Sequence, residues 1–397
     1  MPALFLCLAS VTGSRLAAAE NGKAGIEVTV VTLEGEEQRQ TLLGLSPTEI
    51  QCERGGVPLK DVSAIVFAPP GPPAAGATTL HLRNGDVLNN VTLVSGDESK
   101  LALKGETWGS LKIEYKFLHA ISFAGKERPR ADVIEAFLKA APPKEDQILT
   151  AKGETISGYL ERFTEKDMSF NAGGQSRAYA FDQLAAFRLA PLEEYKPRTE
   201  LLGSIELRGG SRVTGKLLAL HDGKLKIEAL NGQPWDIPVD ALSSIAFKGG
   251  KLVYLGELKP AAVEEKPYVG GMPVVYRWRR DRAVTGGTLT IAGKTYEKGL
   301  GVHSFARLEF DLGGQYAKFL CDVGPDLSAG ANSSCAWKVL LDGKEAAAGA
   351  AKAGGKAEPL RLDVTGVQRL ALVCDYGPDD NDAGDHLDWA GARLLKP

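Results

Sequence analysis

The sequence lacks several features that would quickly place a protein in a class. No apolar run reaches the roughly 18 residues of a membrane-spanning helix, so no transmembrane segment is predicted. No Cys-x-x-Cys spacing occurs among the five cysteines, which leaves zinc without support. Lys and Arg number 47 against 50 Asp and Glu. This balance gives no reason to expect nucleic acid or an anionic membrane as a partner.

Motifs of common enzyme classes are also absent. There is no Gly-x-Ser-x-Gly, no His-Glu-x-x-His and no Walker-type glycine-rich loop. His303 and Ser304 are adjacent, which suits a base and its nucleophile poorly. Glycoside hydrolysis needs two carboxylates on either side of the bond, and no segment is left over for a catalytic cleft. We therefore expect a binding protein rather than an enzyme.

Glycine is abundant, with 46 residues among 397, and such a content is typical of many tight turns. The alternating apolar pattern predicts an all-β fold with tandem small five-stranded barrels, followed by one larger β domain. The predicted barrels cover residues 25–68, 78–125, 146–190 and 203–249, and the larger domain covers residues 268–397.

The four upstream segments repeat one pattern. Each opens with an alternating strand that ends in a glycine turn, and each closes on an apolar-x-x-apolar-x-apolar signature. The closing residues are Val62, Ile65, Phe67; Leu118, Ile121, Phe123; Leu184, Phe187, Leu189; Leu242, Ile245, Phe247. The length and strand order resemble Sm-like or SH3-like barrels. A solenoid or propeller-like array is the alternative, since repeats of fixed period also form those.

The linkers between the repeats are long and uneven, which favours separate barrels. Residues 68–77 are rich in proline and predict an extended spacer. Residues 131–138 predict a short helix, with Val133, Ile134, Phe137 and Leu138 on one apolar stripe.

Residues 1–19 read as a signal peptide, with a short apolar run and Ala17-Ala18-Ala19 before Glu20. No Lys or Arg precedes the apolar run, so a buried strand is the alternative. Export would make the protein secreted, periplasmic or part of the cell envelope. It would leave Cys52, Cys321, Cys335 and Cys374. A Cys321–Cys374 disulfide is the first pairing to test, and two buried free thiols are the alternative.

The C-terminal segment contains an internal echo. Cys321-Asp322-Val323-Gly324-Pro325-Asp326 is matched by Cys374-Asp375-Tyr376-Gly377-Pro378-Asp379. In both copies an alternating run predicts a strand, and Gly-Pro ends it. If the two strands face one core, the two Gly-Pro-Asp loops emerge at the same end and carry carboxylates there.

Several motifs in this segment occur together and in order. They are Tyr296-x-Lys298-Gly299-Leu300-Gly301-Val302-His303, Phe310-Asp311-Leu312-Gly313-Gly314, Phe319-x-x-Asp322-Val323-Gly324-x-Asp326, Leu341-Asp342-Gly343-Lys344 and Gly384-Asp385-His386-x-Asp388-Trp389. In these motifs the segment resembles the NPCBM family, the "novel putative carbohydrate-binding module". The resemblance implies a jelly-roll β-sandwich that binds a glycan or polysaccharide, often with a structural calcium ion.

Sugars pair apolar faces with rings of hydroxyl groups, so aromatic rings beside polar groups bind them. The candidate residues are His303, Trp389, Asp388, Trp337 and Trp278. Trp389 in the last strand is alternatively a core residue, and His303 is alternatively structural. The arginines of residues 277–282 favour an edge strand over a nucleic-acid site.

Crowded carboxylates in the second Gly-Pro-Asp loop suggest a Ca²⁺ site, because calcium takes six to eight oxygen ligands. The candidate ligands are Asp379, Asp380, Asp382 and Asp385. A solvated acidic turn is the alternative. Asp385 and Asp388 are alternatively structural, with hydrogen bonds to the backbone near His303.

Together these patterns predict a non-catalytic, exported carbohydrate-binding protein whose repeats act as spacers or contact other proteins. An oligomerising scaffold without sugar binding and an accessory subunit of a glycoside hydrolase are the alternatives.

Overall fold

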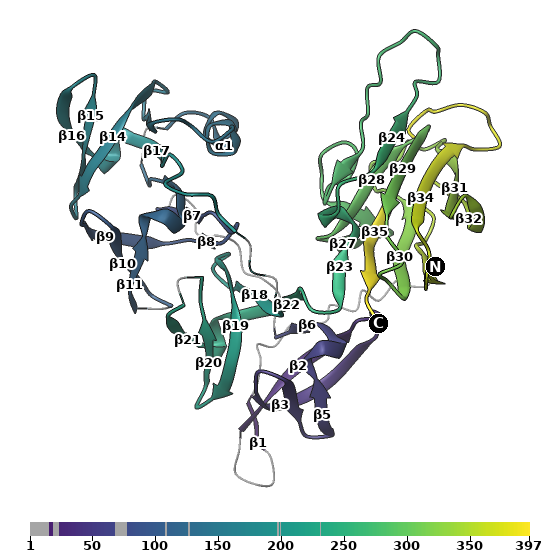
Figure 1. Cartoon of the computed structure of the whole chain (residues 1–397), viewed down its shortest axis with the longest axis horizontal. Helices are drawn as coiled ribbons and strands as arrows, with labels where there is room; N and C mark the ends of the chain where they lie inside the picture. Colours follow the sequence, from purple (N-terminus) through teal and green to yellow (C-terminus); the bar gives the residue numbers. More distant parts are fainter. Residues whose placement is uncertain are drawn as a thin grey trace, which may run out of the picture. The chain divides into compact units, whose positions relative to one another are not determined.

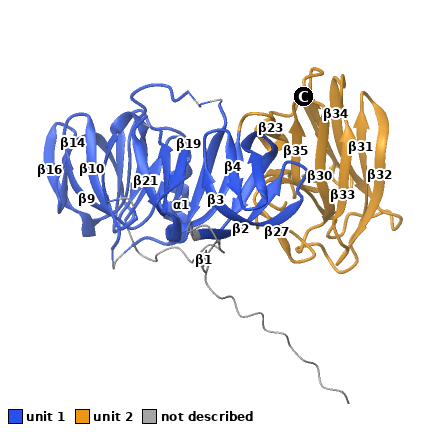
Figure 2. Ribbon diagram, turned by 90° about the horizontal axis from the view of Figure 1, so that it is seen from below, with its two compact units in different colours: residues 1–248 blue, residues 249–397 orange. Residues whose placement is uncertain are grey.

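The computed structural model describes residues 16–18, 24–67, 78–107, 109–125, 128–196, 198, 200–230 and 232–397. The chain divides into two compact units, residues 1–248 and 249–397, drawn in two colours in Figure 2. Both consist mainly of strands, which confirms the all-β prediction. Among the described residues, no helix combines the length and apolar character that crossing a membrane requires.

Two predicted segments lie mostly or wholly outside the residues that the structure describes. Within the predicted signal peptide, only β1 (Leu16–Ala18) is described, antiparallel to the following strand. The rest of residues 1–19 and the predicted spacer, residues 68–77, lie outside the described residues. The signal peptide therefore stays a prediction.

The N-terminal unit contains four repeats, each with a 3₁₀ turn before its last strand (Figure 1). The first has β2 (Ala24–Thr32), β3 (Glu37–Leu45), β4 (Glu49–Cys52), β5 (Gly55–Pro58) and β6 (Val62–Val66). The second has β7 (Thr79–Leu82), β8 (Val87–Leu88), β9 (Val91–Gly96), β10 (Lys100–Gly105), β11 (Gly109–Glu114) and β12 (Leu118–Ser122). The third has β13 (Asp146–Thr150), β14 (Thr155–Phe163), β15 (Asp167–Ala172), β16 (Gln175–Ala180) and β17 (Leu184–Arg188). The fourth has β18 (Leu202–Leu207), β19 (Arg212–His221), β20 (Lys224–Glu228), β21 (Pro234–Pro238) and β22 (Leu242–Lys248).

Strand pairing follows one scheme in the first, third and fourth repeats. The first strand pairs with the last, and the first four strands pair in succession. In the second repeat β7 pairs with β8 and β12, while β9, β10 and β11 form a separate ladder. The residues of the closing signature are buried in the core of this unit in all four repeats. Closure of each repeat into a barrel stays a prediction.

The repeats also pair with one another through their last strands, which the sequence did not indicate. Strand β6 runs antiparallel to β22, with Ile65 opposite Ile245. Strand β12 runs antiparallel to β17, with Ile121 opposite Phe187. Since each of these four residues is the middle position of its closing signature, both pairs have a local two-fold relation. The first repeat thus pairs with the fourth, and the second with the third, which covers edges that would otherwise be open.

The predicted linker helix is confirmed as α1 (Ala131–Lys139). Its Ile134 is buried against the β17 alanines Ala185 and Ala186. The buried guanidinium of Arg188 holds the end of the helix by donating to the carbonyl oxygen of Phe137 over 2.6 Å. Val133 is 41% exposed, so the predicted apolar stripe is buried only in part.

The C-terminal unit is a β-sandwich of two antiparallel sheets around one core. One sheet contains β23 (Leu252–Tyr254), β25 (Arg279–Arg280), β28 (Gly299–His303), β30 (Lys318–Pro325), β33 (Glu358–Asp363) and β35 (His386–Leu395). The other contains β24 (Ala262–Glu265), β29 (Ala306–Asp311), β31 (Ser334–Leu341), β32 (Lys344–Lys352) and β34 (Arg369–Tyr376). A hairpin of β26 (Leu289–Ile291) and β27 (Lys294–Tyr296) is separate. The short strand β25 lies at a sheet edge, as predicted for the arginine-rich segment.

Two strands of this sandwich precede residue 268, where the sequence predicted the domain to begin. Strand β23 pairs with β35, and β24 pairs with β29. Both are therefore integral to the sheets.

The echoed strands β30 and β34 lie in different sheets and face one core, where Cys321 and Cys374 are buried as free thiols. The predicted Cys321–Cys374 disulfide is therefore wrong, and the free-thiol alternative holds. Facing sheets are about 10 Å apart, whereas a disulfide requires Cα atoms within about 7 Å. The loops that follow the two strands do emerge at one end, because the Gly330 N–H donates to the Gly384 carbonyl over 3.0 Å.

Candidate functional site

Three aromatic rings meet at this end of the sandwich, and we call Tyr276, His303 and His386 the ring cluster. His303 at the end of β28 lies directly opposite His386 at the start of β35, and the ring centroids are 5.5 Å apart. Tyr276 stacks on His303 at 5.1 Å and meets His386 edge-on at 4.9 Å. Tyr276 is 39% exposed and His303 is half-buried, so the cluster reaches the surface.

His386 is the buried member of the ring cluster, at 5% exposure. Its Nδ1 lies 2.9 Å from the carbonyl oxygen of Ser328, which can only accept, so Nδ1 carries the proton in the neutral ring. Burial, together with the nearby His303, lowers the pKa of His386. Its Nε2 is buried and has no hydrogen-bond partner within the described chain. The ring cluster therefore contains a buried acceptor nitrogen that the described chain leaves unsatisfied.

A buried carboxylate supports the turn after His303. Asp385 is fully buried and accepts from the Ser304 hydroxyl over 2.7 Å and from the Ser334 N–H over 3.0 Å. These two hydrogen bonds agree with the structural role beside His303 that we gave as the alternative for Asp385.

Asp388 is a second buried carboxyl group, and it lies beside the carboxyl group of Asp326. The two side chains are 0% and 4% exposed, and each accepts from the Thr290 N–H over 3.1 Å. Burial, followed by the neighbouring Asp326, raises the pKa of Asp388 to about 9. Asp388 is thus protonated at neutral pH. It accepts a hydrogen bond from the Thr290 backbone and does not face a ligand.

The predicted tryptophans do not lie in the ring cluster. Trp337 and Trp389 are 1% and 0% exposed and meet edge-to-face at 6.0 Å inside the core. A ring enclosed in this way cannot stack on a sugar, so the core alternative given for Trp389 holds and applies to Trp337 too. Trp278 is half-buried against the same core, and its backbone N–H donates to the Glu265 carboxylate.

The predicted calcium ligands of the acidic loop differ in exposure and are not grouped in the described chain. Asp379 and Asp380 are exposed, while Asp385 is buried and already accepts two hydrogen bonds. Within the described ranges, no three His, Cys, Asp or Glu side chains are grouped so that they could hold a metal. Calcium at Asp379, Asp380, Asp382 and Asp385 stays an untested prediction.

Sequence reasoning identified His303 but missed Tyr276 and His386. His386 was visible inside the Gly-Asp-His-x-Asp-Trp motif, and Tyr276 opens the aromatic and arginine-rich segment. The missing information was register, because only the pairing of β28 with β35 places His386 opposite His303.

Comparisons with known proteins match one segment of the chain to a known domain family. The NPCBM/NEW2 domain model matches residues 252–395, and no curated protein matches the chain. The solved structures that are similar include a CBM51 module of Clostridium perfringens in complex with methyl-galactose, at 25% identity and a TM-score of 0.33, covering 36% of this chain and 99% of that one.

Two further structures have lower identity. A structure of a second CBM51 module with GlcNAc and INT domains from C. perfringens ZmpB has 23% identity and a TM-score of 0.33, and covers 45% of this chain and 39% of that one. Tandem CBM51 modules of a family 98 glycoside hydrolase from Streptococcus pneumoniae have 15% identity and a TM-score of 0.32, and cover 66% of this chain and 91% of that one. Residues 252–395 form an NPCBM/NEW2 domain, as their motifs predicted.

Proposed function

We propose that the protein binds carbohydrate through its NPCBM/NEW2 domain, at the ring cluster of Tyr276, His303 and His386. The observation that carries the proposal is the exposed Tyr276 ring stacked on the half-buried His303. The Nδ1 of His303 donates to the Ser304 carbonyl oxygen over 2.6 Å, which leaves Nε2 as the acceptor of the neutral ring. An aromatic face can cover the apolar side of a sugar ring, while a ring nitrogen accepts from a hydroxyl group. The two requirements of sugar recognition therefore occur within one small site.

We further propose that the protein is not an enzyme. The carboxyl groups nearest the ring cluster in sequence and hydrogen bonding are Asp326, Asp385 and Asp388, and all three are buried. Each is engaged by backbone or hydroxyl donors. Cleavage of a glycosidic bond requires two carboxyl groups that reach the substrate, and these three do not.

Export remains part of the proposal, since a carbohydrate-binding protein meets polysaccharide outside the cell. The repeats would act as spacers or contacts for other proteins. The competing scaffold hypothesis requires free edges for assembly with other copies. Its weakness is that β6 pairs with β22 and β12 with β17 inside one chain, so those four edges are already used.

Isothermal titration of the full chain against a glycan panel that includes methyl-galactose and GlcNAc tests the function. For a ligand that binds, Tyr276→Ala should weaken affinity about tenfold or more, because it removes the aromatic face that stacks on His303. Tyr268→Ala is the matched control, since Tyr268 is exposed in the same segment but contacts Tyr376 instead. Absence of binding across the panel, or equal losses in both variants, would refute the site.

A further inference from the structure

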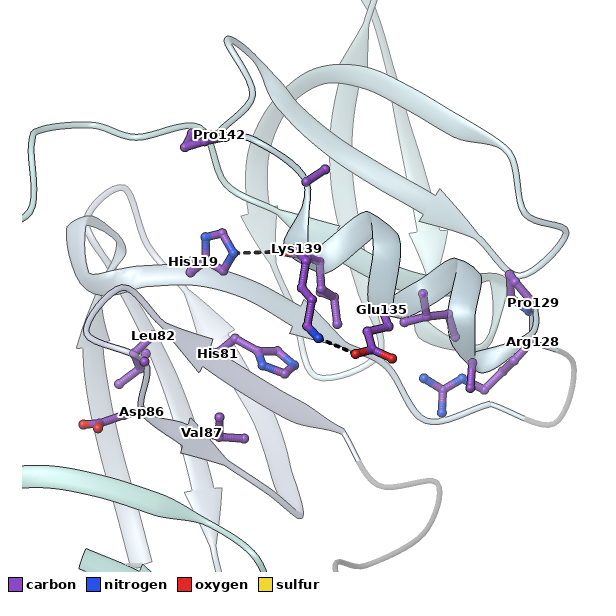
Figure 3. A pocket seen from close by; sticks show the side chains of 15 residues that line it. His81, Leu82, Asp86, Val87, His119, Arg128, Pro129, Glu135, Lys139 and Pro142 are labelled. Atoms are coloured by element: carbon purple, nitrogen blue, oxygen red, sulfur yellow. Dashed lines mark hydrogen bonds and ion pairs between the residues drawn. The ribbon is translucent and has the colours of Figure 1, made fainter. Parts of the chain in front are cut away.

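A second site lies in the N-terminal unit, where a cavity of about 830 Å³ separates the β7–β8 hairpin from α1 (Figure 3). Leu82 and Val87 of the hairpin form one apolar wall, and Ile134 and Leu138 of the helix form another. This volume lies within the roughly 300–1,000 Å³ of small-molecule sites, which are also mostly apolar. The pocket is open to solvent on one side and can therefore hold, without fully enclosing it, a small organic molecule.

Two histidines supply polar groups to the cavity without supplying charge. His119 Nε2 lies 3.1 Å from the carbonyl oxygen of Leu138, and His81 Nε2 lies 3.1 Å from the Ser122 hydroxyl. Burial, followed by the nearby His119, lowers the pKa of His81 to about 4, and burial also lowers the pKa of His119. Both rings are therefore neutral at pH 7.

The charged side chains around the cavity favour an anion. Glu135 and Lys139 on the helix pair with each other, so their charges offset (Figure 3). The Asp86 carboxyl points away from the two histidines in Figure 3 and accepts from the Thr214 N–H over 2.8 Å. Arg128 also lines the cavity, and its Nε is buried without a hydrogen-bond partner within the described chain. The four charged side chains of the lining sum to zero charge, but Asp86 is engaged by Thr214 and Glu135 by Lys139, so Arg128 is the cation that the described lining leaves without an ion pair.

We propose that this cavity binds a small organic anion with an apolar body, such as an aryl or alkyl carboxylate or sulfonate. The apolar walls enclose the body of the ligand, and Arg128 donates to its anionic group. This site is independent of the carbohydrate site, because every residue that forms it belongs to the N-terminal unit.

Fluorescence titration of the full chain with two dyes tests the proposal. The anionic probe is anilinonaphthalene sulfonate, and the uncharged probe is N-phenylnaphthylamine. Arg128→Gln should weaken binding of the sulfonate about tenfold or more, because a charge-assisted hydrogen bond is lost, and should leave the uncharged dye unchanged. Ala131→Phe should weaken both dyes, since Ala131 lines the cavity from an exposed helix position and a ring there fills it.

Arg130→Gln is the matched control, because Arg130 lies two residues from Arg128 but pairs with Asp132 on the surface. It should change neither titration. The proposal is overturned if the sulfonate does not bind saturably, if Ala131→Phe leaves its affinity unchanged, or if Arg128→Gln and Arg130→Gln have the same effect.

Discussion

Replacing Asp388 by Asn should make the NPCBM/NEW2 domain more stable at neutral pH. Asp388 has a folded-state pKa of about 9, against an ordinary value of 3.8. The unfolded chain therefore loses this proton first, so the stability that the group contributes is complete below about pH 4 and declines as pH rises toward 9. At about 1.4 kcal/mol per pH unit, the loss at pH 7 is at most about 4 kcal/mol. An Asn amide can still donate to Asp326, but it does not titrate.

Urea unfolding of wild type and Asp388→Asn at pH 5, 7 and 8.5, followed by tryptophan fluorescence, measures this effect. Trp337 and Trp389 are buried in the domain that holds Asp388 and report its unfolding. The stability difference, variant minus wild type, should increase with pH over this range. Asp379→Asn in the exposed acidic loop should give a difference close to zero at every pH. A difference that is flat, or that falls with pH, would refute the buried protonated carboxyl.

Three further predictions follow from packing and pairing. In urea titrations, Gly384→Ala should lower the unfolding free energy of the domain far more than Gly343→Ala. A Cβ at Gly384 would lie 2.5 Å from the Gly330 nitrogen, while one at Gly343 meets open space. Equal losses would contradict this packing. Val66→Cys with Ser244→Cys should form a disulfide within one chain on mild oxidation, since the two residues are opposite each other in β6 and β22; cross-linked dimers on a non-reducing gel would contradict the intramolecular pairing. The four buried cysteines should react with Ellman's reagent only after unfolding, because the protein encloses all four thiols. Burial also raises the thiol pKa of Cys52 in β4 and of Cys321 in β30. Rapid reaction in native protein would show that the cores are open.

Local pattern predicted much of the fold. Alternation located the closing strands of all four repeats, including β6 and β22, and placed the linker helix within one residue of its observed end. These features depend on residues close in the chain, where period and turn chemistry decide the structure. The pairing of β6 with β22 joins segments about 180 residues apart, and local apolar periodicity carries no information about such a partnership.

The site was predictable only in part, for the same reason. His303 was identified because it follows a glycine-rich motif, and the two Gly-Pro-Asp loops were expected at one end. Trp389 and Trp337 have the residue type of a sugar platform, but the alternation of β31 and β35 turns both inward. Composition shows which rings exist, whereas burial decides which of them a ligand can reach.

The central claim is that sugar is bound at the ring cluster, and the position of a bound sugar tests it most directly. A crystal structure of the protein with a glycan identified by titration should place a sugar ring against Tyr276, with a hydroxyl within hydrogen-bond distance of His303 Nε2. A sugar bound elsewhere on the domain, with Tyr276 and His303 untouched, would contradict the account.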